Sequence, residues 1–355
     1  MALALVYDDA YLEYEITPTH PERSERLVYT LARLEEEGLF DHPAIDVRSP
    51  SRATTDDLLR VHEKSYLSRL RRLSRRGRGA LSGDTRVTRE TWETARLAAG
   101  GLCRAGDLVA NDEYDAAYAM VRPPGHHAGR DTGHGFCYVN NTAVLVRHLQ
   151  QAHGDDRVVI WDIDAHHCDG TQDIFYDDPD TLVISAHQDP ETQFPNTGSI
   201  DETGDGAGVD TQINIPLPPG AGDDAYERVV NDVFVPATRT FDPDFLVVEA
   251  GHDAHFSDFT SDLQMTAAGY RTLIRHARET ALDVCDGRIV AGLSGGYSIE
   301  DGLPFTTLAL IAELADLEAG TLIEPGEPPE PTTTLPEIEG ILERVRSAHD
   351  RRWWP

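Results

Sequence analysis

Acids and histidines are concentrated in the segment WDIDAHHCDG, residues 161–170, at the end of the apolar run RVVIW. Asp164 and His166 are two positions apart, so their side chains point the same way if the segment is extended. Carboxylate oxygens and imidazole nitrogens are good ligands for Zn²⁺, and three protein ligands leave a catalytic ion with an open position. Asp253, in EAGHDAH, is the candidate third ligand. The spacing therefore predicts a metal centre made of Asp164, His166 and Asp253.

A second pair of histidines, His126 and His127, stands in RPPGHHAG. The two prolines stiffen this turn and the glycine permits close backbone packing, which suits a positioned base. A histidine can take a proton from a metal-bound water at neutral pH, and a carboxylate behind it commonly fixes its tautomer. Asp162 and Asp169 are available for that role. We therefore expect one acid of the first segment to bind metal and two to support histidines.

Tyr297 follows two glycines, Gly295 and Gly296, in SGGYS. The glycines leave this loop free of side chains, and we expect it to be able to swing the phenol into a pocket. There the hydroxyl could donate to the oxyanion that forms when water attacks a carbonyl. Phe136 in HGFCYVNN and Phe194 in QFPNTG are candidates for the walls of a narrow apolar channel.

These groups follow short apolar runs, which alternate with longer amphipathic stretches. This alternation predicts an α/β fold with a mostly parallel sheet covered on both faces. Ligand sites form beyond the carboxyl ends of such strands, so four strand ends should deliver histidine, aspartate, glycine and tyrosine to one edge. The predicted strands are Ala4–Tyr7, Ala116–Val121, Val158–Trp161, Thr181–Ser185, Gln212–Ile215, Phe245–Val248 and Arg288–Leu293. The predicted helices are Glu22–Glu37, Arg89–Leu108, Thr142–Ala152, Asp223–Thr240 and Met265–Cys285.

One clear linker interrupts the chain: EPGEPPEPTTTLP, residues 324–336, which is rich in proline and threonine. Residues 1–323 show no other break of this kind and are predicted to form one catalytic domain. A short charged helix and tail, residues 337–355, should pack on the outside.

The composition is strongly acidic, with 62 Asp and Glu against 31 Lys and Arg and a formal net charge of −31. Such a surface repels nucleic acid phosphate and anionic lipid, so we expect neither as a direct partner. Lys64 is the one lysine. Few lysines with many acids indicate a protein adapted to high salt, where screening removes the self-repulsion.

Four cysteines without CxxC spacing favour reduced thiols in a cytosolic enzyme. The N-terminal stretch MALALVYDDAYLEYEI lacks the basic region and the apolar length of a signal peptide. No segment approaches the roughly 18 apolar residues of a membrane span. These features predict a soluble, cytoplasmic protein.

Taken in order, the segments RPPGHHA, GFCYVNN, DIDAHHCDGTQ, ISAH, FPNTG, AGHDAH and SGGY resemble the motifs of the zinc-dependent histone deacetylase superfamily. That superfamily includes acetylpolyamine amidohydrolases and acetoin-utilisation proteins, and HPERSERL near the N-terminus is similar to its opening motif. The resemblance runs from about Ala4 to about Leu317. It implies the arginase-like fold, a single domain around an eight-stranded parallel sheet flanked by helices, and hydrolysis of an acetylated amine to release acetate.

The resemblance also implies roles for individual residues. The three residues of the predicted metal centre would ligate one Zn²⁺, and His127 would be the general base of the tandem histidines. Asp162 would pair with His126 and Asp169 with His127, while Tyr297 would polarise the substrate carbonyl. The implied substrate-binding residues are Gly135, Phe136, Phe194, Gly295 and Gly296. The implied structural potassium site consists of Asp162, Asp164, His166, Ser185 and Ala186.

Four residues depart from the family pattern. Cys168 stands where glycine is usual, and we expect it to pack rather than to react. His252 replaces an apolar residue before Asp253, and His255 and Asp258 make the following loop polar. The resemblance implies that this loop shapes the channel rim.

Several alternatives remain open at this stage. The substrate could be protein acetyl-lysine, an acetylated polyamine or another acyl-amine, with a broad-specificity deacetylase slightly favoured, and the native metal could be Fe²⁺ instead of Zn²⁺. A binuclear manganese ureohydrolase shares the fold, but EAGHDAHFSD lacks its DxDxxDP spacing. A non-catalytic acetyl-lysine binding protein should have lost a ligand, a histidine or the tyrosine, and none is missing. The oligomeric state does not follow from the sequence.

Overall fold

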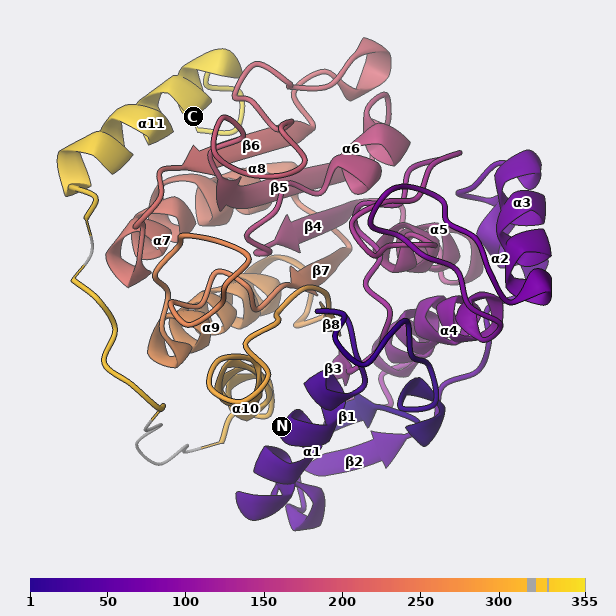
Figure 1. Ribbon diagram of the computed structural model, residues 1–355. Coiled ribbons are helices and arrows are strands. Elements are labelled where there is room, and N and C mark those ends of the chain that lie inside the picture. Colours follow the sequence, from indigo (N-terminus) through magenta and orange to yellow (C-terminus); the bar gives the residue numbers. More distant parts are fainter. Residues whose placement is uncertain (318–323, 331, 355) are drawn as a thin grey trace.

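The apolar runs form an eight-stranded parallel sheet in the computed structural model, which describes residues 1–317, 324–330 and 332–354 (Figure 1). The strand order is β2-β1-β3-β8-β7-β4-β5-β6, and every neighbouring pair is parallel. The strands are β1 Leu3–Val6, β2 Ile45–Arg48, β3 Ala116–Ala119, β4 Val158–Asp162, β5 Thr181–Gln188, β6 Gln212–Leu217, β7 Phe245–Ala250 and β8 Ile289–Leu293. The expected single α/β domain with an eight-stranded parallel sheet is confirmed.

Helices cover both faces of this sheet. α4 packs on β1, β3 and β8 and contacts α5, whereas α9 and α10 pack on β7 and β3 from the other side (Figure 1). In chain order the helices are α1 Glu25–Glu36, α2 Thr55–Leu59, α3 Lys64–Arg76, α4 Thr91–Ala110, α5 Asn141–Ala152, α6 Asp169–Phe175, α7 Asp223–Val229, α8 Val235–Phe241, α9 Ala267–Val284, α10 Leu303–Leu314 and α11 Leu335–Ala348. A π-helical turn, Val230–Phe234, joins α7 to α8.

The central strands are buried along their whole length, as the continuous apolar runs indicated. Every residue of β4 is buried, and Trp161 stacks on Phe234 with ring centroids 4.7 Å apart. This packing holds the acid-rich segment after β4 on a rigid support, because a buried strand with neighbours on both sides cannot move independently. None of the described helices is long and apolar enough to cross a membrane.

The C-terminal helix lies outside the sheet, against β6 and α7 (Figure 1). Trp353, after the helix, is buried and donates from Nε1 to the Asp210 carbonyl at 2.7 Å. The predicted domain boundary at residue 323 and residue 331 of the predicted linker lie outside the described residues. Glu324, at the start of that linker, accepts hydrogen bonds from the backbone of Ala267 and from His255, each at 2.8 Å.

Candidate active site

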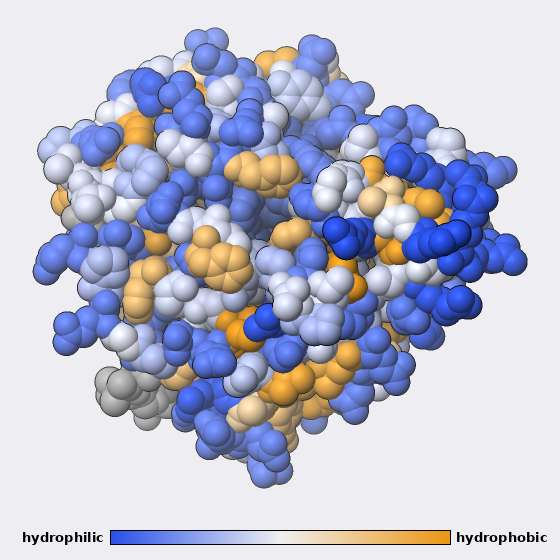
Figure 2. All heavy atoms as spheres, in the orientation of Figure 1, coloured by the Kyte–Doolittle hydropathy of each residue, from blue (hydrophilic) through white to orange (hydrophobic). Residues whose placement is uncertain are grey.

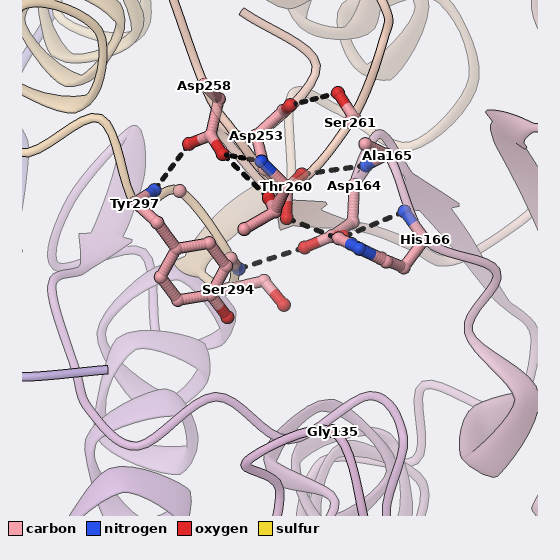
Figure 3. Close-up of polar contacts among 12 residues, drawn as sticks. Gly135, Asp164, Ala165, His166, Asp253, Asp258, Thr260, Ser261, Ser294 and Tyr297 are labelled. Carbon is pink, nitrogen blue, oxygen red and sulfur yellow. Dashed lines mark hydrogen bonds and ion pairs between the residues drawn. The ribbon is translucent and has the colours of Figure 1, made fainter. Parts of the chain in front are cut away.

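The loops that follow β3, β4, β7 and β8 converge at one edge of the sheet, because these strands are neighbours in the order β3-β8-β7-β4. The tandem histidines follow β3 and the acid-rich segment follows β4. Asp253 follows β7 and Tyr297 follows β8. Figure 3 shows Asp164, His166, Asp253 and Tyr297 gathered in one small region. The structure therefore brings these sequence-predicted residues together.

One imidazole and two carboxylates form a compact ligand set at this edge. The Nδ1 atom of His166 lies 3.0 Å from an Asp164 oxygen and 3.1 Å from an Asp253 oxygen, and the ligand atoms of all three lie within 4.8 Å of one another. Burial raises the pKa of Asp253 to about 7, and the nearby Asp164 carboxylate adds to this effect. Two buried carboxylates beside one imidazole are a donor set that a divalent cation would stabilise. These residues fit a Zn²⁺ ion.

Backbone groups hold the two carboxylates in place. Asp164 accepts a hydrogen bond from the Gly295 amide at 2.9 Å, and Asp253 accepts one from the Ala165 amide at 2.8 Å. A Cβ atom at Gly295 would lie 2.2 Å from an oxygen of Asp253, and one at Gly251 would lie 2.2 Å from an oxygen of Asp164. Gly295 thus permits close approach to the ligand set, a different role from the loop freedom that the sequence suggested.

A second group of metal-ligand type lies elsewhere in the described part of the chain. Asp107 on α4 contacts His148 and His153, whose Nε2 atoms are 2.6 and 2.8 Å from the same carboxylate oxygen. Each ring can hydrogen-bond this shared oxygen, so the group links α4 to the C-terminal end of α5. It lies outside the strand-end loops.

His126 contacts two carboxylates. Its Nδ1 atom is 3.1 Å from Asp162, and its Nε2 atom is 3.8 Å from Asp164. Burial opposes the charged form of His126, but the negative charges of Asp164 and Asp162 outweigh burial and hold the pKa well above its ordinary value. Glu249, on the neighbouring strand β7, is in register with Asp162 and accepts a hydrogen bond from Thr142. Burial, followed by repulsion from Asp162, raises the pKa of Glu249 to about 7.

His127 is in a different environment, although it also binds a carboxylate through Nδ1. The Asp169 oxygen lies 2.7 Å from this atom, and the second Asp169 oxygen lies 2.8 Å from Nε2 of His134. Burial lowers the pKa of His127 to about 4, and the nearby His126 adds to the effect. His127 is therefore neutral at pH 7 and has Nε2 available to accept a proton. Sequence reasoning missed His134, which stands beside Gly135 in the quoted HGFCYVNN segment.

The Tyr297 loop is anchored at several points. Asp258 accepts a hydrogen bond from the Tyr297 amide at 2.5 Å (Figure 3). It also accepts one from the Ser298 amide at 2.9 Å. The guanidinium of Arg26 lies over the Tyr297 ring, 4.8 Å from its centroid. Burial holds the pKa of Tyr297 well above its ordinary value, so the phenol keeps its proton and can donate it in a hydrogen bond. Asp258, which the sequence marked only as a departure, positions this loop.

Arg26 belongs to a buried charge network that the sequence did not reveal. It donates to the carbonyls of Gly296 at 2.7 Å and Ser294 at 2.6 Å. Glu22 accepts from Arg122 at 2.8 Å and pairs with Arg26 at 3.3 Å, and all three charged side chains are fully buried. Burial opposes ionisation of Glu22, but the two guanidiniums outweigh it and lower the pKa. The sequence feature that could have indicated this network is the presence of its charged residues in two family motifs: Glu22 and Arg26 in HPERSERL, and Arg122 in RPPGHHA.

Aromatic side chains surround the approach to the ligand set. The Phe136 ring meets Tyr297 edge-on with centroids 5.7 Å apart, and the Phe194 ring meets His127 edge-on at 5.1 Å. Phe194 is 39% exposed, so it lies at the surface end of the predicted channel. Gly135 has a φ of +55°, and a Cβ atom there would lie 2.3 Å from the His127 ring. Figure 2 shows apolar patches around a hollow near the centre of this face.

The predicted potassium ligands lie on two adjacent strands and the loop after β4. Asp162 is in register with Ser185, and Ala186 is the next residue of β5. The Ser185 hydroxyl hydrogen-bonds the His187 ring at 2.8 Å. Asp162 also accepts a hydrogen bond from the Asp164 amide at 2.9 Å, so its side chain fixes the start of the loop after β4.

All four departures are buried in the structure. Cys168 lies in the hydrophobic core immediately before α6, and burial holds the pKa of its thiol well above the usual range. His252 stacks on Tyr270 with centroids 5.5 Å apart, and burial lowers its pKa to about 3. His255 contacts Glu324, as described above. All four cysteines are free and buried.

Comparisons with known proteins agree with this arrangement. A family profile described as the histone deacetylase domain matches residues 20–313, a somewhat shorter stretch than the motif resemblance suggested. The chain belongs to the histone deacetylase family. The protein is an amidohydrolase of the deacetylase type.

Relatives from several organisms share most of the chain. A "Probable deacetylase" of Archaeoglobus fulgidus is 42% identical over 359 residues, covering 99% of both chains. A "Histone deacetylase-like amidohydrolase" of Pseudomonas aeruginosa is 38% identical over 275 residues, covering 78% of this chain and 72% of the relative. The crystal structure of the HDA15 HD domain superposes with a TM-score of 0.88 at 28% identity, covering 99% of this chain and 97% of that one.

Proposed function

We propose that the protein is a zinc-dependent deacetylase that hydrolyses the amide of acetyl-lysine or a related acetylated amine and releases acetate. The observation that carries this proposal is the meeting of three groups at one sheet edge: the ligand set, the neutral histidine His127 and the phenol of Tyr297. Each supports a different requirement of amide hydrolysis, namely metal binding, proton transfer and oxyanion stabilisation.

Asp164, His166 and Asp253 would hold the ion. When bound there, Zn²⁺ supplies Lewis acidity toward the acetyl carbonyl and lowers the pKa of water. The same oxygen and nitrogen donors suit Fe²⁺, so the native metal is part of the test. We further propose a structural K⁺ near Asp162, Asp164, His166, Ser185 and Ala186.

The chain's own residues provide the proton transfers. His127 accepts a proton from the attacking water, and Asp169 stabilises the imidazolium that results. His127 then returns the proton to the leaving amine. His126, charged because of its two carboxylate neighbours, places positive charge beside the reacting centre. Tyr297 donates to the oxyanion, and its buried ring is held for this by Arg26 and Asp258.

The substrate is an acetylated amine on a linear carbon chain, because the aromatic walls suit a narrow aliphatic segment. Protein acetyl-lysine is the preferred class, and acetylated polyamines are the alternative. The binuclear ureohydrolase is disfavoured because its second metal would need further ligands, and the described residues form a single ligand set of this kind at this edge. A non-catalytic binding protein is disfavoured because its chain would not need His127 and Tyr297 in these positions.

The test is hydrolysis by zinc-loaded protein of acetyl-lysine peptides and of acetylpolyamines, with the metal content of each chain measured in parallel. We expect acetate release with one catalytic ion per chain, loss of activity on chelation and recovery with Zn²⁺. Fe²⁺ reconstitution under anaerobic conditions compares the two metals. Full metal content without hydrolysis of either substrate class contradicts the proposal, and two catalytic Mn²⁺ ions per chain support the ureohydrolase instead.

A further inference from the structure

The negative charge of this protein is distributed unevenly. Residues 64–89 contain a single acid, Asp84, in a chain whose acids outnumber its bases by 62 to 31. This segment comprises α3 and the loop after it. Its bases, all exposed, are named here the basic patch: Lys64, Arg69, Arg71, Arg72, Arg75, Arg76, Arg78, Arg86 and Arg89.

The bases of the basic patch also differ from most other arginines of the protein in that they form no ion pairs with described carboxylates. Elsewhere most arginines pair with acids, as Arg228 does with Asp232 at 2.8 Å and Arg239 with Asp283 at 2.7 Å. Within the described parts of the chain, no carboxylate lies within 4.0 Å of a charged nitrogen of the basic patch. An ordinary solvated face would share the acid-rich surroundings of the rest of the molecule. The charged groups of the basic patch are therefore free to bind an anionic group of another molecule.

The lone acid of the segment does not neutralise these bases. Asp84 accepts hydrogen bonds from Ser82 at 2.5 Å and from the backbone amide of Gly135 at 3.0 Å. Thr85 accepts from the Phe136 amide, also at 3.0 Å. Gly135 and Phe136 belong to the predicted channel wall, so the loop that carries part of the basic patch also supports that wall.

Several arginines face the same side of α3. Arg71, Arg72, Arg75 and Arg76 line one shallow hollow together with Ser68, as expected for positions three and four apart on a helix. Figure 2 shows strongly hydrophilic side chains gathered over α3, on the same face as the central hollow. Guanidinium groups bind carboxylates through paired hydrogen bonds, so this hollow suits an acidic side chain.

We propose that the basic patch binds acidic residues that flank the acetylated lysine of a polypeptide substrate, and thereby selects acidic substrates. This inference rests on the proposed deacetylase function. A short acidic flank can touch the basic patch alone, whereas nucleic acid or a second copy of this chain would also meet the acidic remainder of a molecule with a net charge of −31. The hydrogen bonds that join the loop after α3 to Gly135 and Phe136 of the channel wall favour a substrate over a remote partner.

The experiment compares acetyl-lysine peptides of equal length with acidic, neutral or basic flanks, at the lowest ionic strength at which the protein stays folded. We expect kcat/KM for the acidic peptide to exceed that for the neutral peptide by about tenfold, and the ratio to fall as salt screens the charges. The variant R72Q/R75Q/R76Q should reduce this ratio to near one and leave hydrolysis of the neutral peptide unchanged. The control R104Q/R344Q should keep the preference, because it removes two arginines outside the basic patch that form no ion pair with any described carboxylate.

Fluorescence anisotropy of a labelled acidic peptide measures binding independently of turnover. Equal kcat/KM for acidic and neutral peptides, or a preference that survives in R72Q/R75Q/R76Q, overturns the inference. Binding of single-stranded RNA or self-association that depends on the basic patch, without a peptide preference, overturns it as well. Inactivity toward every peptide at full metal content counts against the proposed function, while binding of the acidic peptide that is lost in the triple variant still supports the basic patch.

Discussion

His126 and His127 are adjacent, and each contacts an aspartate through Nδ1, yet their surroundings favour opposite protonation states. His126 lies between the carboxylates of Asp162 and Asp164, which raise its pKa despite burial. His127 has Asp169 as its one close carboxylate, which it shares with His134, and burial and the neighbouring His126 lower its pKa.

The two environments show that a histidine–carboxylate pair does not by itself define a general base. The partner's other contacts and the neighbouring charges decide which histidine is neutral at pH 7. In this protein, proximity to Asp164, a proposed metal ligand, favours charge on His126, and the second imidazole on Asp169 weakens the support for charge on His127.

The largest effect is expected for His127→Ala. Loss of the proton carrier should lower kcat by about 10³-fold and leave zinc content and the melting temperature near those of the wild type. His126→Ala is the matched comparison and should lose less, about tenfold to a hundredfold, because it removes a stabilising charge. Equal losses in the two variants would contradict the division of roles.

Tyr297→Phe should lower kcat by about a hundredfold or more, since it removes one oxyanion donor and keeps the ring in place. The effect should be similar at all pH values at which the wild type is active, because Tyr297 does not titrate in that range. Single-turnover hydrolysis of an acetyl-lysine peptide measures it. Near-normal turnover would remove the tyrosine from the mechanism.

Asp169→Asn and Asp162→Asn test the carboxylates themselves. Asp169→Asn should lower kcat by about tenfold to a hundredfold, because the amide no longer fixes the His127 tautomer. Asp162→Asn should instead lower the pKa of His126, since one of its two stabilising negative charges is lost. NMR titration of the two imidazoles separates these outcomes, and an unchanged His126 pKa in Asp162→Asn would refute the assigned cause.

His134→Gln should have the smallest effect, a change of about threefold in kcat/KM at pH 7. Asp169 would lose a charged partner, so more of its negative charge would act on His127 and raise that pKa from about 4. Because His127 must be neutral to accept a proton, the acidic limb of the pH–rate profile should move to higher pH. A shift to lower pH would show that His134 does not compete for Asp169.

The sequence predicted much of the sheet because its central strands are uniformly apolar. β2 was missed because only Ile45 of Ile45–Arg48 is buried, so this edge strand has no apolar run. α10 was missed for the opposite reason: Leu303–Leu314 is buried on all sides and shows no helical periodicity. Both errors arise where the environment, rather than local pattern, determines the element.

The candidate site was predictable where its chemistry lies next to a strand end, as for Asp164 and His166. The residues that support the site were not predictable, because they contact residues far away in the sequence. Arg26, for example, donates to the Gly296 carbonyl, 270 positions later in the chain. Composition likewise concealed the basic patch, since a net charge averages over the surface. Residue types therefore indicated the proposed reaction. The three-dimensional packing was needed to find the residues that position the reacting groups and those proposed to select the substrate.

The placement of α11 has a consequence for the behaviour of the protein in solution. β6 is the last strand of the sheet, and α11 lies against it. An uncovered strand edge offers unpaired backbone groups to other chains and promotes aggregation. Without this helix, we expect the protein to aggregate through the edge of β6, while the molecules that stay in solution keep their activity. We therefore expect the C-terminal helix to protect the folded protein from aggregation, far from the reacting groups.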